Sequence, residues 1–213
     1  MPKSIFFDLD GTLTDSSEGI TRCAQLALAC FGIYVPDLSR LNALIGPPLR
    51  ETFPAYGVPP ERTEEAVAIF RSRYNTVGKF ENTPYPGIRE MLSELSRREN
   101  RLFVATSKPE KTAVEILSHF GLDVFFEGIC GASMDGSRDS KKAVIAHLLT
   151  RTVGVEDVVM VGDTAFDVIG AAAHGIPTIG VSWGFGKTGD MLSSGAAAIA
   201  DTPEELLKLL SED

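Results

Sequence analysis

The residues best suited to chemistry are two aspartates that directly follow a short apolar run near the start of the chain. Residues 5–7 are apolar and predict a buried strand, and Asp8 and Asp10 come at its end. Gly11 then gives the backbone the freedom to turn away. A carboxylate at the end of a buried strand is costly unless a positive charge compensates it. Two such carboxylates predict a divalent cation, and hard oxygen ligands favour magnesium.

Polar side chains also follow two later apolar runs. One cluster, residues 106–108, comes directly after the run 102–105, and a second, residues 163–167, comes after the run 158–161. Side chains of these types can bind an anion or a metal ion at the end of a strand. The candidates in the two clusters are Thr106, Ser107, Lys108, Asp163 and Asp167.

Short apolar segments and helical patterns alternate after residues 83–87, where a Pro- and Gly-containing stretch interrupts the chain. This alternation predicts an α/β fold, with a Rossmann-like parallel sheet core and helices on both faces. In such a sheet ligands bind beyond the carboxyl ends of the strands, so the three polar clusters are expected to converge on one pocket. We expect strands at residues 5–7, 102–105, 128–131, 158–161, 178–181 and 198–200, the last at an edge, and helices at 88–98, 110–120, 140–150, 165–174 and 203–210.

The stretch between the first strand and this alternating region is expected to be helical throughout. No segment of residues 16–80 alternates like a strand, and apolar side chains recur there at helical spacing. We therefore predict an inserted α-helical domain at residues 16–80 and a core domain formed by residues 1–15 and 81–213, with hinges at the two crossings. The expected helices are 17–32, 36–44, 49–56 and 61–77.

Residues 8–13, Asp-Leu-Asp-Gly-Thr-Leu, resemble the Asp-x-Asp-Gly-Thr-Leu signature of the haloacid-dehalogenase superfamily. Later residues stand where that superfamily has its other motifs: Thr106 at the second, Lys141 at the third, and Asp163 with Asp167 at the fourth. The resemblance covers essentially the whole chain and implies that the inserted domain is a cap. Residues 46–49, 106–109 and 181–186 are similar to the phosphoglycolate-phosphatase-like group, which has a small helical cap.

The resemblance implies a role for each aspartate. Asp8 would be the nucleophile, forming an aspartyl-phosphate, and Asp10 the general acid and base. Mg²⁺ would be bound by Asp8, Asp163 and the backbone carbonyl of Asp10, and Asp167 would hold either a metal-bound water or Lys141. The implied metal set is therefore Asp8, Asp10, Asp163 and Asp167.

The contacts to phosphate leave alternatives open. The resemblance implies that Thr106 offers a hydroxyl, and Lys141 a positive charge, to the phosphoryl group. Ser107 competes with Thr106 for the first role, and the adjacent Lys142 competes with Lys141 for the second. Lys108 either reaches the substrate or is solvated. The substrate-binding candidates are Thr106, Ser107, Lys108, Lys141 and Arg50, and the aromatic pair Trp183 and Phe185 either lines the substrate mouth or belongs to the core.

Composition restricts the class of protein and its partners. The chain of 213 residues has a net charge of −9, which disfavours nucleic acid or an anionic membrane as a partner. Its three cysteines show no metal-binding spacing, and Cys23 and Cys30, seven apart in a helical pattern, are expected in the core. No apolar signal-peptide region opens the sequence. We expect a cytoplasmic monomer or weak homodimer whose partner is a small phosphorylated metabolite.

The predicted activity is magnesium-dependent hydrolysis of a small phosphomonoester, phosphoglycolate-like in the first instance. 5′-Nucleotides, pyrophosphate and phosphotyrosine remain open as substrates of related enzymes. The sugar-phosphate mutases of this superfamily place a histidine in the first helix after the signature. Residues 17–20, which open that helix here, contain no histidine, so a mutase is disfavoured. Asp10 argues against a haloacid dehalogenase, which lacks that second acid. A protein that only binds and regulates is disfavoured because the nucleophile, the acid and the cation are all present.

Overall fold

The computed structural model describes residues 3–152 and 154–211, and the chain divides into two compact units. The sheet unit comprises Met1–Thr14 and Pro84–Asp213, and the helical unit comprises Asp15–Thr83. The helical unit is therefore an insertion in the sequence of the sheet unit.

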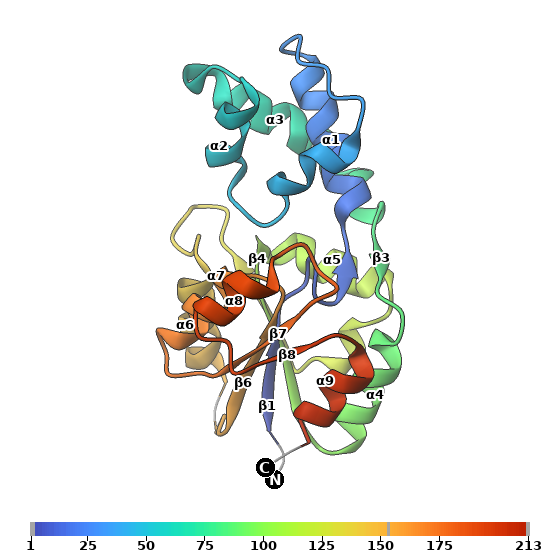
Figure 1. The fold of residues 1–213 in the computed structure, drawn as a ribbon, viewed down its shortest axis with the longest axis vertical. Helices are drawn as coiled ribbons and strands as arrows, with labels where there is room; N and C mark the ends of the chain where they lie inside the picture. The colour runs from blue at the N-terminus through green and yellow to red at the C-terminus, as the bar shows by residue number, and fades with distance from the viewer. Residues whose placement is uncertain (1–2, 153, 212–213) are drawn as a thin grey trace. The chain divides into compact units, whose positions relative to one another are not determined.

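The sheet unit is built on parallel strands with β1 (Ser4–Phe7) near the middle (Figure 1). Among the described residues the sheet has six strands in the order β5-β4-β1-β6-β7-β8, and every neighbouring pair is parallel. The predicted parallel α/β core is confirmed, and β8 lies at an edge as expected. The other strands are β4 (Arg101–Pro109), β5 (Gly128–Ala132), β6 (Val158–Gly162), β7 (Thr178–Val181) and β8 (Ala198–Ala200).

Helices cover both faces of this sheet because successive residues of β1 point to opposite sides. Ile5 and Phe7 pack in one buried cluster with apolar side chains of α4, α5 and α9, whereas Phe6 packs in a second cluster with those of α6 and α7. Figure 1 shows α4 and α9 side by side on the first face. The helices are α4 (Ile88–Arg97), α5 (Glu110–His119), η5 (Asp123–Phe125), α6 (Lys141–Arg151), α7 (Ala165–Ala172), α8 (Thr188–Ser193) and α9 (Pro203–Leu209).

The helical unit has its own apolar centre, to which α1 and α3 both contribute buried side chains. Phe53 and Phe70 pack edge to face with ring centroids 6.4 Å apart. A partly buried ion pair, Arg73 with Glu81 at 2.6 Å, lies beside the buried thiol of Cys23, to which Arg73 donates at 3.2 Å. The described elements here are α1 (Ser17–Ala29), η1 (Leu38–Leu44), α2 (Leu49–Thr52), η2 (Phe53–Tyr56), η3 (Pro60–Arg62), α3 (Thr63–Tyr74) and η4 (Gly78–Phe80).

Two short strands, β2 (Thr14–Asp15) and β3 (Thr83–Pro84), pair where the chain passes from one unit to the other. The sequence did not predict them, because two residues cannot show an alternating pattern. Just beyond them, the Tyr85 backbone N–H donates to the Leu13 carbonyl at 3.1 Å. The outgoing and returning segments are therefore tied together by backbone hydrogen bonds.

Three further details differ from the sequence-based expectations. β4 continues past residue 105 to Pro109, and α8 was not predicted. Cys23 is buried, but Cys30 is exposed, so its expected place in the core is wrong. The buried residues of α1 end at Leu28, and Cys30 is the C-cap residue that follows the helix.

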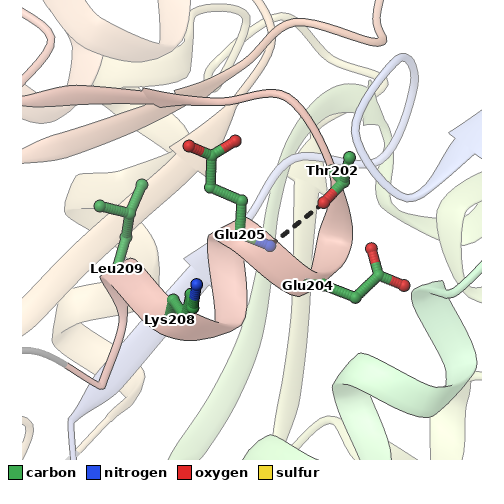
Figure 2. A pocket seen from close by; sticks show the side chains of 5 residues that line it. All are labelled: Thr202, Glu204, Glu205, Lys208 and Leu209. Atoms are coloured by element: carbon green, nitrogen blue, oxygen red, sulfur yellow. Dashed lines mark hydrogen bonds between the residues drawn. The ribbon is translucent and has the colours of Figure 1, made fainter.

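The surface at the C-terminal helix carries a pocket that is separate from all predicted site residues. Thr202 caps α9, its hydroxyl accepting from the Glu205 backbone N–H at 3.2 Å (Figure 2). The lining side chains are Thr202, Glu204, Glu205, Lys208 and Leu209. Within residues 3–152 and 154–211 we find no helix with the length and apolar character that crossing a bilayer requires.

Candidate active site

The carboxyl ends of β1 and β6 bring three buried carboxylates together. Asp8 directly follows β1, Asp163 directly follows β6, and the Asp8 backbone N–H donates to the Val161 carbonyl at 2.9 Å. Asp167 comes from the first turn of α7. Carboxylate oxygens of Asp8, Asp163 and Asp167 all lie within 4.8 Å of one another. The predicted convergence of these strand ends therefore produces an acidic cluster.

Lys141, the first residue of α6, places its ammonium group inside this cluster. Its Nζ lies 2.7 Å from Asp8 Oδ1 and 2.7 Å from Asp167 Oδ1, and it donates to the Ala105 carbonyl at 2.9 Å. The ammonium is therefore held by two ion pairs and by one hydrogen bond to the backbone. Lys142, its competitor in the sequence, is exposed. Gly170 makes room for the lysine stem, since an added Cβ there would lie 2.7 Å from Lys141 Cγ.

Asp167 is held by the start of its own helix. Its Oδ2 accepts from the Thr164 backbone N–H at 3.1 Å and from the Thr164 hydroxyl at 2.8 Å. Its Oδ1 faces Lys141. At Gly162 an added Cβ would lie 2.3 Å from Asp167 Cγ, so a side chain there would displace the carboxylate. The geometry fits the role of holding Lys141, one of the two alternatives predicted for Asp167.

Asp163 is held by two segments that lie far apart in the sequence. Its Oδ2 accepts from the Phe185 backbone N–H at 2.8 Å, and its Oδ1 accepts from the Thr12 hydroxyl at 3.3 Å. An added Cβ at Gly184 would lie 2.3 Å from Asp163 Cβ. Sequence reasoning missed this support. Its available signal was the pair of glycines, Gly184 and Gly186, in a loop after a strand.

Asp10 and Lys108 form a second ion pair, also at the carboxyl ends of the strands. Lys108 Nζ lies 2.6 Å from Asp10 Oδ2, and the two side chains are 5% and 16% exposed. Lys108 is therefore neither solvated nor free of protein contacts. Asp10 Oδ1 is buried and has no hydrogen-bond partner among the described residues. An unpaired buried carboxylate oxygen is costly, and a substrate or an ion bound beside it would satisfy it.

Of the two β4 residues that compete for the hydroxyl contact to phosphate, Thr106 is buried and Ser107 is exposed. Thr106 is 1% exposed, and its hydroxyl accepts from the Lys108 backbone N–H at 3.2 Å. Arg50 belongs to the helical unit, where it forms a bidentate pair with Glu64, and the two side chains are 61% and 68% exposed.

The acidic cluster carries more negative charge than its lysine balances. Burial raises the pKa of Asp8 to about 6, although Lys141 opposes the shift. Burial, together with the Asp167 and Asp8 carboxylates, raises the pKa of Asp163 to about 8. Burial lowers the pKa of Lys141, but Asp167 and Asp8 outweigh it and keep that pKa above its ordinary value. With all three carboxylates ionised, two negative charges remain, and this set of oxygen donors fits a hard divalent cation such as Mg²⁺.

These pKa values predict that stabilisation by Mg²⁺ increases with pH. Asp8 and Asp163 have folded-state pKa values above the unfolded value of 3.8. Their stabilising protonation is complete below about pH 4 and is lost as pH rises through about 6 and then about 8. In EDTA the melting temperature should therefore fall between pH 5 and pH 8, and the gain on adding Mg²⁺ should grow over the same range. Thermal scans with and without Mg²⁺ test this, and a gain independent of pH would contradict it.

Comparisons with known proteins place this chain in a family. The family model of the haloacid dehalogenase-like hydrolases matches residues 5–181. The chain belongs to the haloacid dehalogenase-like hydrolase family. The superfamily resemblance seen in the sequence is thereby confirmed, and phosphatases are among its relatives. A crystal structure of a predicted phosphatase from Clostridium acetobutylicum is 40% identical, with a TM-score of 0.92, covering 99% of this chain and 98% of that one.

Relatives of this hydrolase bear three different functional names. A 5′-nucleotidase of Pseudomonas aeruginosa is 46% identical over 88% of this chain and 86% of its own. A tyrosine-protein kinase, PtkA, of Mycobacterium tuberculosis is 45% identical over 98% of this chain and 72% of its own. A phosphoglycolate phosphatase of Rhodospirillum rubrum is 32% identical over 94% of this chain and 88% of its own.

Proposed function

We propose that this hydrolase is a magnesium-dependent phosphatase that cleaves small phosphomonoesters through an aspartyl-phosphate on Asp8. The observation that carries the proposal is the pairing of two carboxylates with two lysines at the carboxyl ends of the strands. Asp8 Oδ1 lies 2.7 Å from Lys141 Nζ, and Asp10 Oδ2 lies 2.6 Å from Lys108 Nζ. Mg²⁺ would be held by Asp8, Asp163 and the Asp10 carbonyl. When bound, it supplies positive charge that offsets repulsion between an anionic nucleophile and an anionic substrate.

The residues of the chain account for both halves of the reaction. A carboxylate oxygen of Asp8 attacks phosphorus, and the bond to the leaving oxygen breaks as Asp10 donates it a proton. Asp10 then takes a proton from water, whose oxygen attacks the same phosphorus and releases phosphate and free Asp8. Lys141 keeps Asp8 ionised and oriented, and Thr106 supplies a hydroxyl to the phosphoryl oxygens.

The helical unit would act as the cap of this phosphatase. We propose that residues 15–83 limit access to the site, with hinges at β2 and β3, and that Arg50 contributes to substrate binding by exchanging Glu64 for an anion. A cap of this kind favours small substrates and excludes bulk water.

All three cysteines are free, which supports a reducing compartment such as the cytoplasm. We further propose that the enzyme is a monomer or a weak homodimer.

The substrate is proposed at the level of its class. Both 5′-nucleotides and phosphoglycolate-like esters are small phosphomonoesters, and relatives with both names exist. The higher identity of the 5′-nucleotidase, 46% against 32%, supports testing nucleoside 5′-monophosphates first.

An activity panel tests the proposed reaction. We expect Mg²⁺-dependent phosphate release from an aryl phosphate and from at least one ester among nucleoside 5′-monophosphates, 2-phosphoglycolate and phosphotyrosine, ranked by kcat/KM. Chelation should abolish turnover and added Mg²⁺ should restore it. Full activity in excess chelator would contradict the metal site. Transfer from ATP to a tyrosine peptide without hydrolysis of any ester would contradict the phosphatase assignment.

A further inference from the structure

Trp183, the single tryptophan of the chain, connects the two segments that cross between the units. Its indole Nε1 donates to the Thr12 carbonyl at 3.1 Å, in the outgoing segment. Its ring packs edge to face against Tyr85, in the returning segment, with centroids 6.4 Å apart and planes at 62°. Tyr85 in turn donates its backbone N–H to Leu13. Trp183 therefore contacts both crossing segments from within the sheet unit.

The same tryptophan anchors both groups that hold Asp163. Thr12, whose carbonyl accepts from the indole, donates its hydroxyl to Asp163 Oδ1. Phe185, two residues after Trp183, donates its backbone N–H to Asp163 Oδ2. Gly184, between these two residues, lies against the site, because an added Cβ there would be 2.4 Å from Asp163 Oδ2 and 2.4 Å from the Gly11 carbonyl oxygen. Movement of Trp183 would therefore move both donors to the Asp163 carboxylate.

We propose that Trp183 is a positioning residue that couples the Asp163 metal ligand to the crossing segments at Leu13 and Tyr85. The inference rests on the proposed binding of Mg²⁺ by Asp163. If Asp163 held a metal ion, its two donors, Thr12 and the loop at residues 183–186, would be ordered with it, and Trp183 would connect them to Tyr85. Bound Mg²⁺ would then rigidify the pair of segments about which the helical unit would move, which would link metal binding to motion of the proposed cap.

Wild-type protein already provides one test, because the coupling residue is its own fluorophore. Mg²⁺ titrated into metal-free protein should produce a saturable change in tryptophan emission. The midpoint should match the dissociation constant measured by calorimetry. In hydrogen exchange, saturating Mg²⁺ should slow exchange in the peptide covering residues 81–88, which contains the hydrogen-bonded Tyr85 amide.

The Trp183→Phe variant tests the indole N–H directly. Phenylalanine keeps an aromatic ring beside Tyr85 but cannot donate to Thr12. We expect the dissociation constant for Mg²⁺ to rise by about 10-fold, the lower end of the range for groups that support metal ligands. The Mg²⁺-dependent protection of residues 81–88 should also be lost at saturating Mg²⁺. Phe125→Leu is the matched control, since Phe125 is a partly buried aromatic that packs on the same apolar cluster and precedes β5, at the other end of the sheet.

The outcomes separate this inference from the proposed function. Mg²⁺ binding in the wild type with an unchanged dissociation constant in Trp183→Phe would overturn the inference alone, as would equal effects of Trp183→Phe and Phe125→Leu. Absence of Mg²⁺ binding by calorimetry in the wild type would contradict the proposed metal site, and the inference would fall with it. A lower melting temperature in both variants, with weaker binding and lost protection only in Trp183→Phe, would support the coupling.

Discussion

Replacing Lys141 with methionine is expected to lower the free energy of unfolding by about 3–5 kcal/mol, because it leaves Asp8 and Asp167 buried without their shared cation. Methionine has a similar length, so the space beside Gly170 stays filled and the loss reports on charge. Urea unfolding at pH 8 in EDTA measures it. At pH 5 the loss should shrink, since the Asp8 carboxyl, with a pKa raised to about 6, then carries a proton.

Lys142→Met is the matched control for this prediction. It removes an adjacent lysine from the same helix, but Lys142 is exposed, and exposed charges contribute at most about 1 kcal/mol. Turnover should collapse in Lys141→Met and persist in Lys142→Met. Equal and small losses of stability in both variants would show that the ammonium of Lys141 does not balance the acidic cluster.

The core fold could be predicted because its strands and helices have strong hydrophobic periodicity. The apolar run at residues 5–7 is buried on both faces, and the pattern of α4 and α6 places one side of each helix against the sheet. The parts that were missed lack such a signal. β2 and β3 are two residues long, and the end of β4 consists of Thr, Ser, Lys and Pro, which as residue types indicate a loop.

The candidate site was predictable where a residue's type and its place at a strand end define it, and not where the order of the strands or the backbone contributes. Strand-end carboxylates could be placed together once the sheet was assumed parallel. The Asp10–Lys108 pair was not foreseen, because it depends on β1 and β4 being neighbours in the sheet. The support of Asp163 was missed for a different reason. One donor is the backbone N–H of Phe185, a group that every residue but proline possesses.

Asp10→Asn should separate the proposed nucleophile from the proposed acid. The backbone carbonyl at residue 10 is retained, so Mg²⁺ and substrate should still bind. An alkyl leaving group needs a proton, so kcat/KM for an alkyl phosphate should drop by about 10²–10⁴-fold, the usual scale for general acid–base catalysis. An activated aryl phosphate needs that proton less, and its first step should be affected less. The second step still lacks its base, so phosphoenzyme should accumulate and be detectable by intact mass after rapid quenching.

Asp8→Asn should block the reaction at an earlier step than Asp10→Asn does, before the phosphoenzyme forms. The amide removes the attacking carboxylate and one metal ligand together, so no phosphoenzyme should form even from an aryl phosphate, and calorimetry should show weaker Mg²⁺ binding. The pair with Lys141 also loses its charge, because Asp8 Oδ1 is the oxygen 2.7 Å from Nζ. The decisive comparison is the trapped intermediate, which only Asp10→Asn should show. Phosphorylation of the Asp8→Asn variant would contradict the assignment of Asp8 as the nucleophile. Equal losses of activity on alkyl and aryl esters in both variants, with no trapped intermediate, would contradict the assignment of both roles.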